Sequence, residues 1–394
     1  MSLIGQEITV IGAGVAGLAL SRALAMRGAK VTVLEQADAI REIGAGLQVS
    51  PNGAVVIRAL GLQEALEAAS TRAEAVELRD GLDGGLVTRL EVGRLRPDQG
   101  YHFLHRADLI ALLLKGAQEV GVELRLLHRV ATVDLTGERP AYVTEAGERA
   151  ECEVLIGADG LHSRLRDALV GKVAPFFTRQ VAWRAVIAEP PGAPLVAEVH
   201  MGPGRHLVTY PLRGGTLRNI VAVEDRNRWV DEGWHIRDDP MDLRLAFDSY
   251  SPRVKSWLEK VEDVWLWGLF RHPVAPIWAK VLPAGAAAIL GDAAHPTLPF
   301  LAQGASMGLE DAWVLADCLA RHDTTAAALS AYQALRLPRT TRIVAAANAN
   351  ARSYHLAGPA RMIAHTGLRL VGKIAPELPL RRFDWLYTHD VTKA

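Results

Sequence analysis

The stretch EITVIGAGVAGLALSRALAMRG, from Glu7 to Gly28, decides the fold of this chain. It opens with a short β-branched run, which is typical of a buried strand. Glycines follow, and apolar residues then recur at helical spacing up to Gly28, where a glycine commonly ends a helix. KVTVLE, from Lys30 to Glu35, predicts a second strand. Strand, helix and strand in this order predict a βαβ unit whose parallel strands are covered on both faces.

Gly12, Gly14 and Gly17 have the spacing G-x-G-x-x-G between the first strand and the helix. The first glycine permits a tight turn, the second lets a pyrophosphate approach the backbone, and the third permits close helix packing. Glu35 ends the second strand about twenty residues later, where a carboxylate can accept hydrogen bonds from a ribose diol. The sequence therefore predicts a dinucleotide site, but this motif alone does not distinguish FAD from NAD.

The composition is that of an ordinary globular protein of 394 residues, with 49% hydrophobic and 22% charged residues. Lysine plus arginine equals aspartate plus glutamate, at 44 each, so charge gives no reason to expect nucleic acid or a membrane as partner. Cys152 and Cys318 lack metal-site spacing, and we expect no metal. No apolar run reaches the roughly 18 residues of a membrane span, and a reduced, cytoplasmic compartment is expected.

The middle of the chain has a different pattern. Alternating segments separated by Pro and Gly, from about Val173 to Lys280, predict antiparallel strands. Helical patterning returns from Gly308 onward. We therefore expect an α/β nucleotide domain interrupted by a sheet-rich insertion and followed by a helical C-terminus.

Two further segments identify the nucleotide. CEVLIGADGLHSRLR, from Cys152 to Arg166, carries Asp159-Gly160, and AAAILGDAAHPTLP, from Ala286 to Pro299, carries Gly291-Asp292, each pair at a strand end. Together with the glycine motif they resemble the three signatures of the class A flavoprotein aromatic hydroxylases. The resemblance covers essentially the whole chain and is greatest to the branch of salicylate hydroxylase, 3-hydroxybenzoate 6-hydroxylase and 6-hydroxynicotinate 3-monooxygenase.

The resemblance implies a Rossmann-like FAD-binding domain of the glutathione-reductase type, comprising residues 1–75, 101–172 and 281–358. Residues 76–100 and 173–280 would form the substrate-binding sheet, and 359–394 a C-terminal helical segment. It further implies bound FAD, NADH or NADPH as a transient co-substrate, O2, and a homodimer. Arg106 in HRADL would contact the phosphate-ribityl region. The cofactor residues expected are Gly12, Gly14, Ala16, Gly17, Glu35, Gln36, Gln48, Arg106, Val130, Asp159, Gly160, Arg166, Gly291, Asp292, Pro299, Gly304 and Ala305.

LGDAAHPTLPFLAQGASMGLEDAW, from Leu290 to Trp313, is expected to form a rigid wall against the flavin. Asp292 can accept a hydrogen bond from a ribityl hydroxyl, and Pro296 and Pro299 stiffen the turn because their φ is fixed. The amides of Gly304 and Ala305 can face the flavin edge where negative charge gathers on reduction. Ala302 stands where the family usually has glycine.

The resemblance implies ring hydroxylation through a flavin C4a-hydroperoxide, possibly with decarboxylation. His206 and Tyr210 in RHLVTYPL are four residues apart in a strand pattern, which places them on one face. In related hydroxylases this pair approaches the substrate hydroxyl, and Gln303 also touches substrate. Gln48 would face the same cavity; it cannot take a proton, unlike the histidine expected there in the 6-hydroxynicotinate relatives.

The catalytic set expected is therefore His206, Tyr210, Gln303 and Pro296, and the substrate-binding set is Gln48, His206, Tyr210 and Gln303, with a small aromatic acid as substrate. Arg184 and Arg205 are both available for its carboxylate. The alternatives are a flavin reductase, a halogenase-like enzyme and a non-catalytic flavin-binding interaction protein. WLWGLF, from Trp265 to Phe270, departs from the halogenase motif Trp-x-Trp-x-Ile-Pro after its third residue, and the two aspartate motifs disfavour an NAD dehydrogenase.

Overall fold

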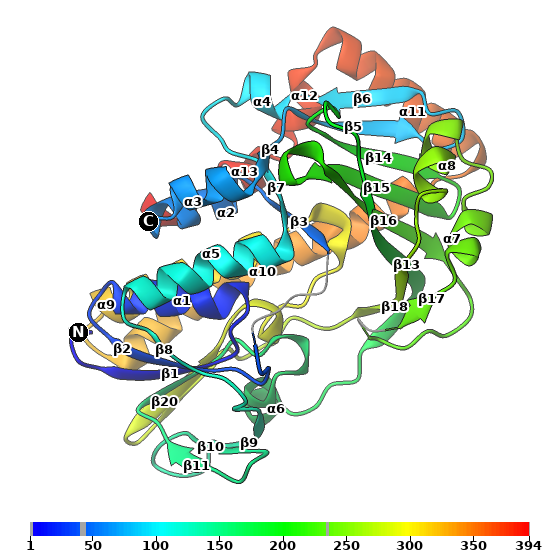
Figure 1. Ribbon diagram of the computed structural model, residues 1–394. Helices are drawn as coiled ribbons and strands as arrows, with labels where there is room; N and C mark the ends of the chain where they lie inside the picture. The colour runs from blue at the N-terminus through cyan, green and yellow to red at the C-terminus, as the bar shows by residue number, and fades with distance from the viewer. Residues whose placement is uncertain (1–2, 40–44, 234–235, 394) are drawn as a thin grey trace.

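The βαβ unit at the N-terminus is the centre of one half of this computed structural model, which describes residues 3–39, 45–233 and 236–393 (Figure 1). β1 (Glu7–Ile11) and β2 (Lys30–Leu34) pair in parallel, and α1 (Val15–Ala25) connects them. Ile8, Val10 and Ile11 are buried, as expected for a strand covered on both faces. Gly28, with a φ of +94°, lies in the turn after α1.

A six-stranded sheet is built around this unit in the order β19-β20-β12-β1-β2-β8. All neighbours in it pair in parallel except β19 and β20, which are antiparallel. The remaining strands are β8 (Glu123–Arg125), β12 (Val154–Gly157), β19 (Ala279–Leu282) and β20 (Gly285–Ile289).

Helices cover this sheet. α5 (Arg106–Glu119) and α9 (Gly304–Arg321) both pack against α1, forming one layer in Figure 1. α6 (Arg164–Val170) contacts β12, β20 and β9. β9 belongs to a small antiparallel sheet of β11 (Arg149–Glu151), β10 (Ala141–Thr144) and β9 (Val130–Asp134).

The second half of the molecule is an eight-stranded sheet in the order β17-β18-β13-β16-β15-β14-β5-β6 (Figure 1). Its neighbours pair antiparallel except β14 and β5, so a segment from the first hundred residues joins strands from the middle of the chain. The strands are β5 (Ala75–Asp80), β6 (Leu86–Leu90), β13 (Phe176–Ala188), β14 (Val196–Gly202), β15 (Arg205–Leu212), β16 (Leu217–Asp225), β17 (Arg237–Asp238) and β18 (Val264–Arg271).

The two faces of this sheet pack differently. Trp183 and Phe247 belong to an apolar cluster on the face covered by α7 (Pro240–Ala246) and α8 (Pro252–Leu258). Ala182 and Val223 point to the other face, where they pack with Phe300. Because side chains alternate along a strand, the inner face is turned toward the segment around residue 300, and this is the face that matters for function.

The rest of the chain connects and closes the two halves. α10 (Thr325–Tyr354) packs against α9 and reaches the eight-stranded sheet at its C-terminal end, and α11 (Gly358–Ile374) lies along β6 (Figure 1). The other elements are a sheet of β3 (Gly46–Val49), β7 (His102–His105) and β4 (Thr71–Arg72), the helices α2 (Pro51–Ala59), α3 (Gln63–Ala69), α4 (Val92–Leu95), α12 (Glu377–Arg381) and α13 (Asp384–Tyr387), and the 3-10 turns η1 (Gly160–His162), η2 (Arg213–Gly215), η3 (Gly291–Ala293), η4 (Pro299–Leu301) and η5 (Val391–Lys393).

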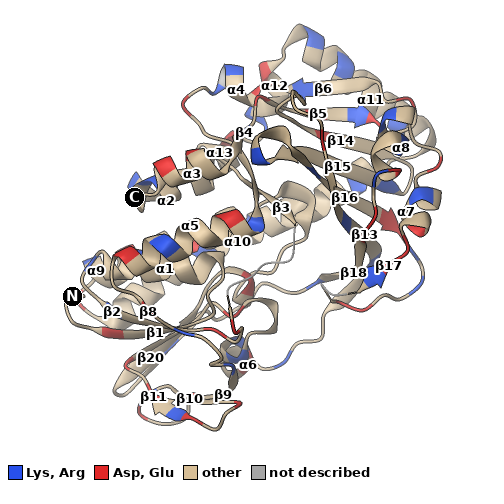
Figure 2. Ribbon diagram, viewed as in Figure 1, with Lys and Arg blue, Asp and Glu red and all other residues tan. Residues whose placement is uncertain are grey.

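The expected α/β class and mixed architecture are confirmed. α9 begins at Gly304, so Gly304 and Ala305 open the helix, and the helical patterning that returns from Gly308 lies inside it. Cys152 and Cys318 are buried free thiols. Within the described ranges, no helix is long and apolar enough to cross a membrane and no cluster of potential metal ligands occurs. Figure 2 shows Lys and Arg interspersed with Asp and Glu over both halves.

Candidate active site

The three glycines of the first motif have different surroundings. A β-carbon on Gly12, which has a φ of +102°, would lie 2.5 Å from the carbonyl oxygen of Ala158, and one on Gly17 would lie 2.0 Å from the carbonyl oxygen of Gly12. A β-carbon on Gly14 would meet no heavy atom within 4 Å. Gly12 and Gly17 therefore allow tight backbone packing, while the open space at Gly14 fits a pyrophosphate at the N-terminus of α1.

Glu35 lies beside this loop. Its Oε2 accepts the backbone N–H of Ala13 at 2.8 Å, and its Oε1 accepts that of Ala37 at 3.0 Å. These two bonds fix the carboxylate at the end of β2, and each oxygen retains a lone pair for a ribose hydroxyl. Gln36, the next residue, is exposed, and Val130, at the start of β9, is buried.

Asp159 follows β12 at the same edge of the sheet. Its Oδ2 accepts the backbone N–H of Arg164 at 2.8 Å, whereas its Oδ1 is buried without a hydrogen-bond partner among the described residues. Burial raises the pKa of this carboxyl group. Gly160, with a φ of +73°, has open space where a side chain would be. An orphaned acceptor beside an open glycine suits a hydroxylated ligand.

Asp292 is solvent-accessible in η3, yet protein surrounds it enough that burial raises its pKa, an effect that the charges of His295 and Arg106 oppose. A β-carbon on Gly291 or on Gly308 would lie 3.1 Å from the β-carbon of Ala16. Ala16, which belongs to the first glycine motif, thus packs against the turn that carries Asp292.

Arg166 holds the same turn through hydrogen bonds to the backbone. It is buried, and its Nη2 donates to the carbonyl oxygen of Pro273 at 2.6 Å, while Nη1 donates to that of Ala293 at 3.5 Å. These contacts are with the backbone next to Asp292. Arg166 thus positions this turn, and its contact with the cofactor itself stays a prediction.

The segment around residue 300 forms a turn that contains Pro296 and Pro299. Pro296 is buried and Pro299 begins η4. Ala302 has a φ of +53° and lies in the left-handed region, which explains why glycine suits this position. In α9, which begins at Gly304 and Ala305, no side chain caps the first turn, so the positive end of the helix dipole is open toward the site.

Gln303 is buried and hydrogen-bonded at both ends of its amide. Its Nε2 donates to Ser50 Oγ at 2.9 Å, and its Oε1 accepts from Asn52 Nδ2 at 3.1 Å. Only 1% of the residue is exposed. Since both ends of its amide are bonded to the N-terminal region of α2, Gln303 joins α9 to α2, and its contact with a substrate stays a prediction.

His206 and Tyr210 lie on the inner face of β15, as their spacing predicts. Both are buried. His206 packs beside Phe300 and Tyr354, with ring centroids 5.5 and 5.2 Å away. Burial, reinforced by the neighbouring His355, lowers the pKa of His206 well below its usual value. A neutral imidazole therefore lies next to the rigid turn.

Tyr210 belongs to an aromatic and amide cluster at the other end of this face. Its ring stacks on Phe103 at 5.2 Å. Burial raises the pKa of its phenol, an effect that the charge of Arg184 and hydrogen bonding to Gln48 and Asn219 oppose. Gln48 also accepts the hydroxyl of Tyr101 at 2.6 Å. Gln48 and Tyr210 are thus brought together, as expected.

The two candidate arginines lie on opposite faces of the eight-stranded sheet. Arg184 lies over the ring of Trp267 at 4.4 Å and its charge acts on Tyr210, so it is at the inner face. Arg205 pairs with Glu224 at 3.5 Å and lies near Phe247 on the outer face. Arg184 is therefore the arginine placed near the aromatic cluster.

Sequence reasoning missed several neighbours of these residues. His355 and Tyr354 come from the end of α10, Asn219 from β16, and Tyr101 from the loop before β7. None belongs to a motif, and each reaches the site only through tertiary packing. For Asn219 the available signal was its place opposite Tyr210 in the strand register.

Comparison with known proteins agrees with this geometry. Residues 6–347 match the family model described as FAD binding domain. The chain is 35% identical to 3-amino-4-hydroxybenzoate 2-monooxygenase PtmB3 of Streptomyces platensis, covering 89% of both chains. It is 33% identical to 3-hydroxybenzoate 6-hydroxylase of Klebsiella oxytoca, covering 96% of this chain and 95% of that one.

Solved structures show the same fold. A salicylate hydroxylase substrate complex superposes with a TM-score of 0.81 at 24% identity, covering 99% of this chain and 97% of that one. The open loop at Gly14 and the orphaned oxygen of Asp159 independently fit a bound dinucleotide. The resemblance to class A flavoprotein hydroxylases is thereby confirmed. This chain belongs to the FAD-binding-domain family and is an FAD-dependent aromatic monooxygenase.

Proposed function

We propose that the enzyme uses NADH or NADPH and O2 to hydroxylate a small phenolic or heteroaromatic acid. The observation that carries this proposal is the arrangement on one sheet face of a neutral buried His206, a buried Tyr210 and the cation of Arg184, opposite the rigid turn at Phe300. This arrangement matches an aromatic ring that carries both a hydroxyl and a carboxylate. The base and the tyrosine hydroxyl suit the ring hydroxyl, the positive charge suits the carboxylate, and the apolar wall suits the ring.

Bound FAD, once reduced by the nicotinamide, would activate O2 to an electrophilic oxygen. His206 accepts the proton of the substrate hydroxyl, because its lowered pKa keeps it neutral near pH 7 and a phenolate is the more electron-rich ring. Tyr210 and Gln48 hold the hydroxyl oxygen of the substrate by hydrogen bonds. Phe300 and Tyr354 pack around His206 and exclude water, which would otherwise quench the oxygenation.

Residues of the FAD-binding half would hold the cofactor. Gly14 leaves room for the pyrophosphate, Glu35 accepts from the ribose, and Asp159 and Asp292 accept from the remaining hydroxyls. The N-terminus of α9 would stabilise negative charge on the reduced ring. We assign residues 1–75, 101–172 and 281–358 to this half, and 76–100 with 173–280 to the substrate side.

Arg184 would bind the substrate carboxylate, since a charge-assisted bond to a carboxylate is favourable in a partly desolvated site. Arg184→Met should raise the KM for a hydroxybenzoate about 10-fold or more, at unchanged FAD affinity. Arg237→Met is a matched control, because Arg237 also lies over a tryptophan, Trp265, but is exposed. Equal KM values for the two variants would remove Arg184 from substrate binding.

A cytoplasmic homodimer is also proposed. α11 exposes an apolar stripe that includes Ile363 and Ile374, at 74% and 73% exposure, and monomers rarely leave such stripes uncovered. A second copy is the partner that fits a self-complementary helix face. Ile363→Glu with Ile374→Glu should convert the dimer to a monomer in light scattering; a wild-type monomer would contradict the proposal.

The function is tested by screening the purified holoenzyme against hydroxybenzoates and hydroxypyridine carboxylates, following NAD(P)H consumption and product mass. We expect one acid to stimulate NAD(P)H oxidation and gain one hydroxyl. His206→Ala should keep FAD and lower the ratio of product to NAD(P)H consumed, with peroxide released instead. Stimulated oxidation without any hydroxylated product from wild type would favour a reductase, and no stimulation at all would favour a binding protein.

A further inference from the structure

His206 is not an isolated base, because it is hydrogen-bonded to a second histidine. Its Nδ1 lies 2.7 Å from Nε2 of His355, the residue that directly follows α10. The two rings are 4.9 Å apart between centroids. Since Nδ1 of His206 is taken by His355, Nε2 is the ring nitrogen available to a substrate.

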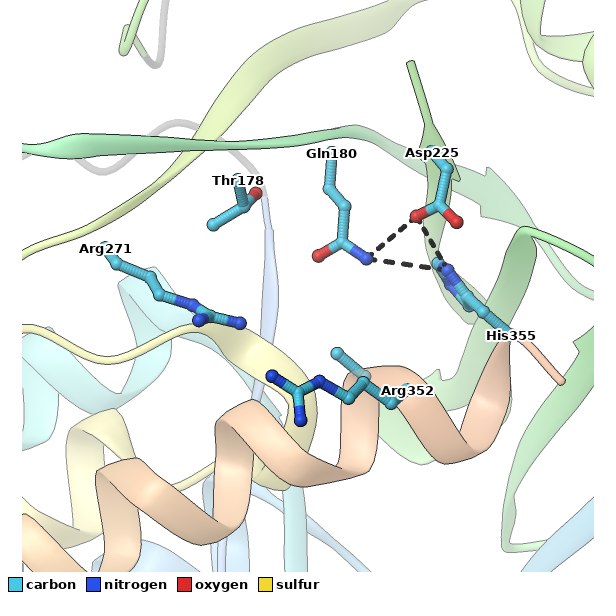
Figure 3. A pocket seen from close by; sticks show the side chains of 7 residues that line it. Thr178, Gln180, Asp225, Arg271, Arg352 and His355 are labelled. Carbon is cyan, nitrogen blue, oxygen red and sulfur yellow. Dashed lines mark hydrogen bonds and ion pairs between the residues drawn. The ribbon is translucent and has the colours of Figure 1, made fainter. Parts of the chain in front are cut away.

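His355 is in turn bonded to Asp225 at the end of β16. Its Nδ1 lies 2.9 Å from Oδ1 of Asp225, and that oxygen also accepts from Nε2 of Gln180 at 2.9 Å (Figure 3). Although burial acts to raise the pKa of Asp225, the hydrogen bonds from His355 and Gln180 hold it below its usual value. Asp225 is therefore a carboxylate, which can only accept.

The shorter of two contacts at Nδ1 of His355 indicates the tautomer of both histidines, because Asp225 Oδ1 lies 2.9 Å away and Gln180 Nε2 lies 3.5 Å away. A carboxylate acceptor requires the proton of His355 on Nδ1, which leaves Nε2 of His355 as an acceptor. The proton of His206 must then lie on its Nδ1, so the lone pair of Nε2 faces the substrate side. An aspartate that orients a histidine through hydrogen bonds is a known way to make it a base.

The chain of bonds leads from a buried residue to solvent. The side chain of His206 is buried, that of His355 is 6% exposed and that of Asp225 is 51% exposed. His355 and Asp225 line a cavity of about 210 Å³, large enough for several waters at about 30 Å³ each. Its other lining residues are Thr178, Gln180, Arg271, Ala351 and Arg352 (Figure 3).

We propose that His355 and Asp225 are positioning residues that orient His206 and carry the substrate proton from the active site to this cavity. The inference rests on the proposed function, since the proton is that of the substrate hydroxyl. The hydroxyl proton moves to Nε2 of His206, the Nδ1 proton of His206 moves to Nε2 of His355, and the Nδ1 proton of His355 leaves through Asp225 to water. The net result is a bound phenolate and one proton in solvent.

The charges around the cavity favour release. Arg271 and Arg352 line it, and the charge of Arg205 acts on Asp225. A proton arriving among these cations is repelled toward bulk water. Phe300 and Tyr354 pack around His206, and the bonds through His355 and Asp225 give it a polar path to the cavity.

The orientation is tested without any substrate. In the 15N-histidine-labelled holoenzyme, long-range 1H–15N spectra should show the Nδ1–H tautomer for both His206 and His355, assigned by the signals lost in His206→Asn and His355→Gln. An Nε2–H tautomer at either residue would overturn the relay. This readout is independent of which acid is the substrate, so it decides the relay even if the proposed function fails.

The transfer is tested by proton release on mixing holoenzyme with 3-hydroxybenzoate, followed with a pH indicator and by phenolate absorbance. We expect His355→Gln, which keeps hydrogen-bonding capacity but cannot ionise, to slow release about 10-fold or more. His322→Gln is the matched control, since α9 separates His322 from the site by about 27 Å at 1.5 Å per residue. Imidazole should restore the rate in His355→Ala. Wild-type release in His355→Gln, or no rescue, would contradict the relay.

Discussion

Asp311 of α9 accepts the backbone N–H of Gly291 at 2.9 Å and so holds the turn that carries Asp292 from within the core. Asp311 is fully buried, and Arg336 donates to it at 2.7 Å and to Glu310 at 2.5 Å. The coulombic and hydrogen-bonding effects of His295 and Arg336 overcome burial and lower the pKa of Asp311 to about 2. The cofactor-facing turn is therefore supported by a buried charge network.

Replacing Arg336 by Met should strongly destabilise the protein. Glu310 and Asp311 would lose their shared cation while remaining buried, and breaking such a pair costs about 3–5 kcal/mol. Urea unfolding measures the change. Arg381→Met is the control: its pair with Glu377 is exposed, and its loss should change the free energy of unfolding by less than about 1 kcal/mol. A similarly small change for Arg336→Met would show that the buried charge network does not contribute to stability.

Gly14→Ala and Gly17→Ala should separate cofactor binding from folding. Gly14 has a φ of −77° and open space around it, so alanine is tolerated by the apoprotein but intrudes where the pyrophosphate binds. We expect normal apoprotein stability with FAD affinity reduced about 100-fold, or about 2.7 kcal/mol. Gly17→Ala should unfold or destabilise the chain, because its methyl group would collide with the carbonyl of Gly12. Flavin fluorescence titration and thermal melting distinguish the two variants. Unchanged FAD affinity in Gly14→Ala would refute pyrophosphate binding at Gly14.

The lowered pKa of His102 should make the free energy of unfolding decrease as the pH falls. Burial, with the charges of Arg72 and Arg58, lowers its pKa from 6.5 to about 4. Above pH 6.5 neither the folded nor the unfolded state holds this proton. As pH falls toward 4 the unfolded state takes it up first, so about 3 kcal/mol of stability is lost.

His102→Gln should therefore remove about 3 kcal/mol of the loss in the free energy of unfolding between pH 6.5 and 4. The measurement is urea unfolding at both pH values. His322→Gln serves as control and should keep the wild-type slope. If His102→Gln also keeps that slope, the histidine titrates normally in the folded state.

Ala302→Gly tests the left-handed residue in the flavin turn. Its φ of +53° costs a non-glycine residue about 1 kcal/mol, which glycine relieves at a backbone-entropy cost of similar size. The variant should stay within about 1 kcal/mol of wild type in thermal unfolding and retain FAD. Ala302→Val, with a β-branched side chain, should lose about 2 kcal/mol or more. Equal stability of the Val variant would mean that this backbone geometry is unimportant.

The parts of the fold that could be predicted from sequence are those with local signals. Local spacing predicts both the βαβ unit and its ligand class. It is the spacing of Gly12, Gly14 and Gly17, each of which meets a local backbone requirement, followed by the acid at Glu35. The spacing of His206 and Tyr210 predicted that they share one face of a strand, while their role at the substrate was implied by the resemblance to the related hydroxylases.

What could not be predicted depends on contacts between distant segments. His355 meets His206 across 149 residues of chain, and no periodicity encodes that meeting. The amide of Gln303 bonds to Ser50, which precedes α2, and to Asn52 within it, and no local pattern predicts these partners. Arg166 likewise bonds the backbone of Pro273. The direction of a side chain at a loop or helix end is set by its tertiary partners, which sequence spacing does not reveal.

The most direct measurement of the central claim uses 18O2. Holoenzyme, NAD(P)H and the acid found to stimulate its oxidation should give a product that carries one 18O atom in a new ring hydroxyl, detected by mass spectrometry. A product without the label, or NAD(P)H oxidation that yields peroxide and unchanged acid in the wild type, would contradict aromatic monooxygenation by this enzyme.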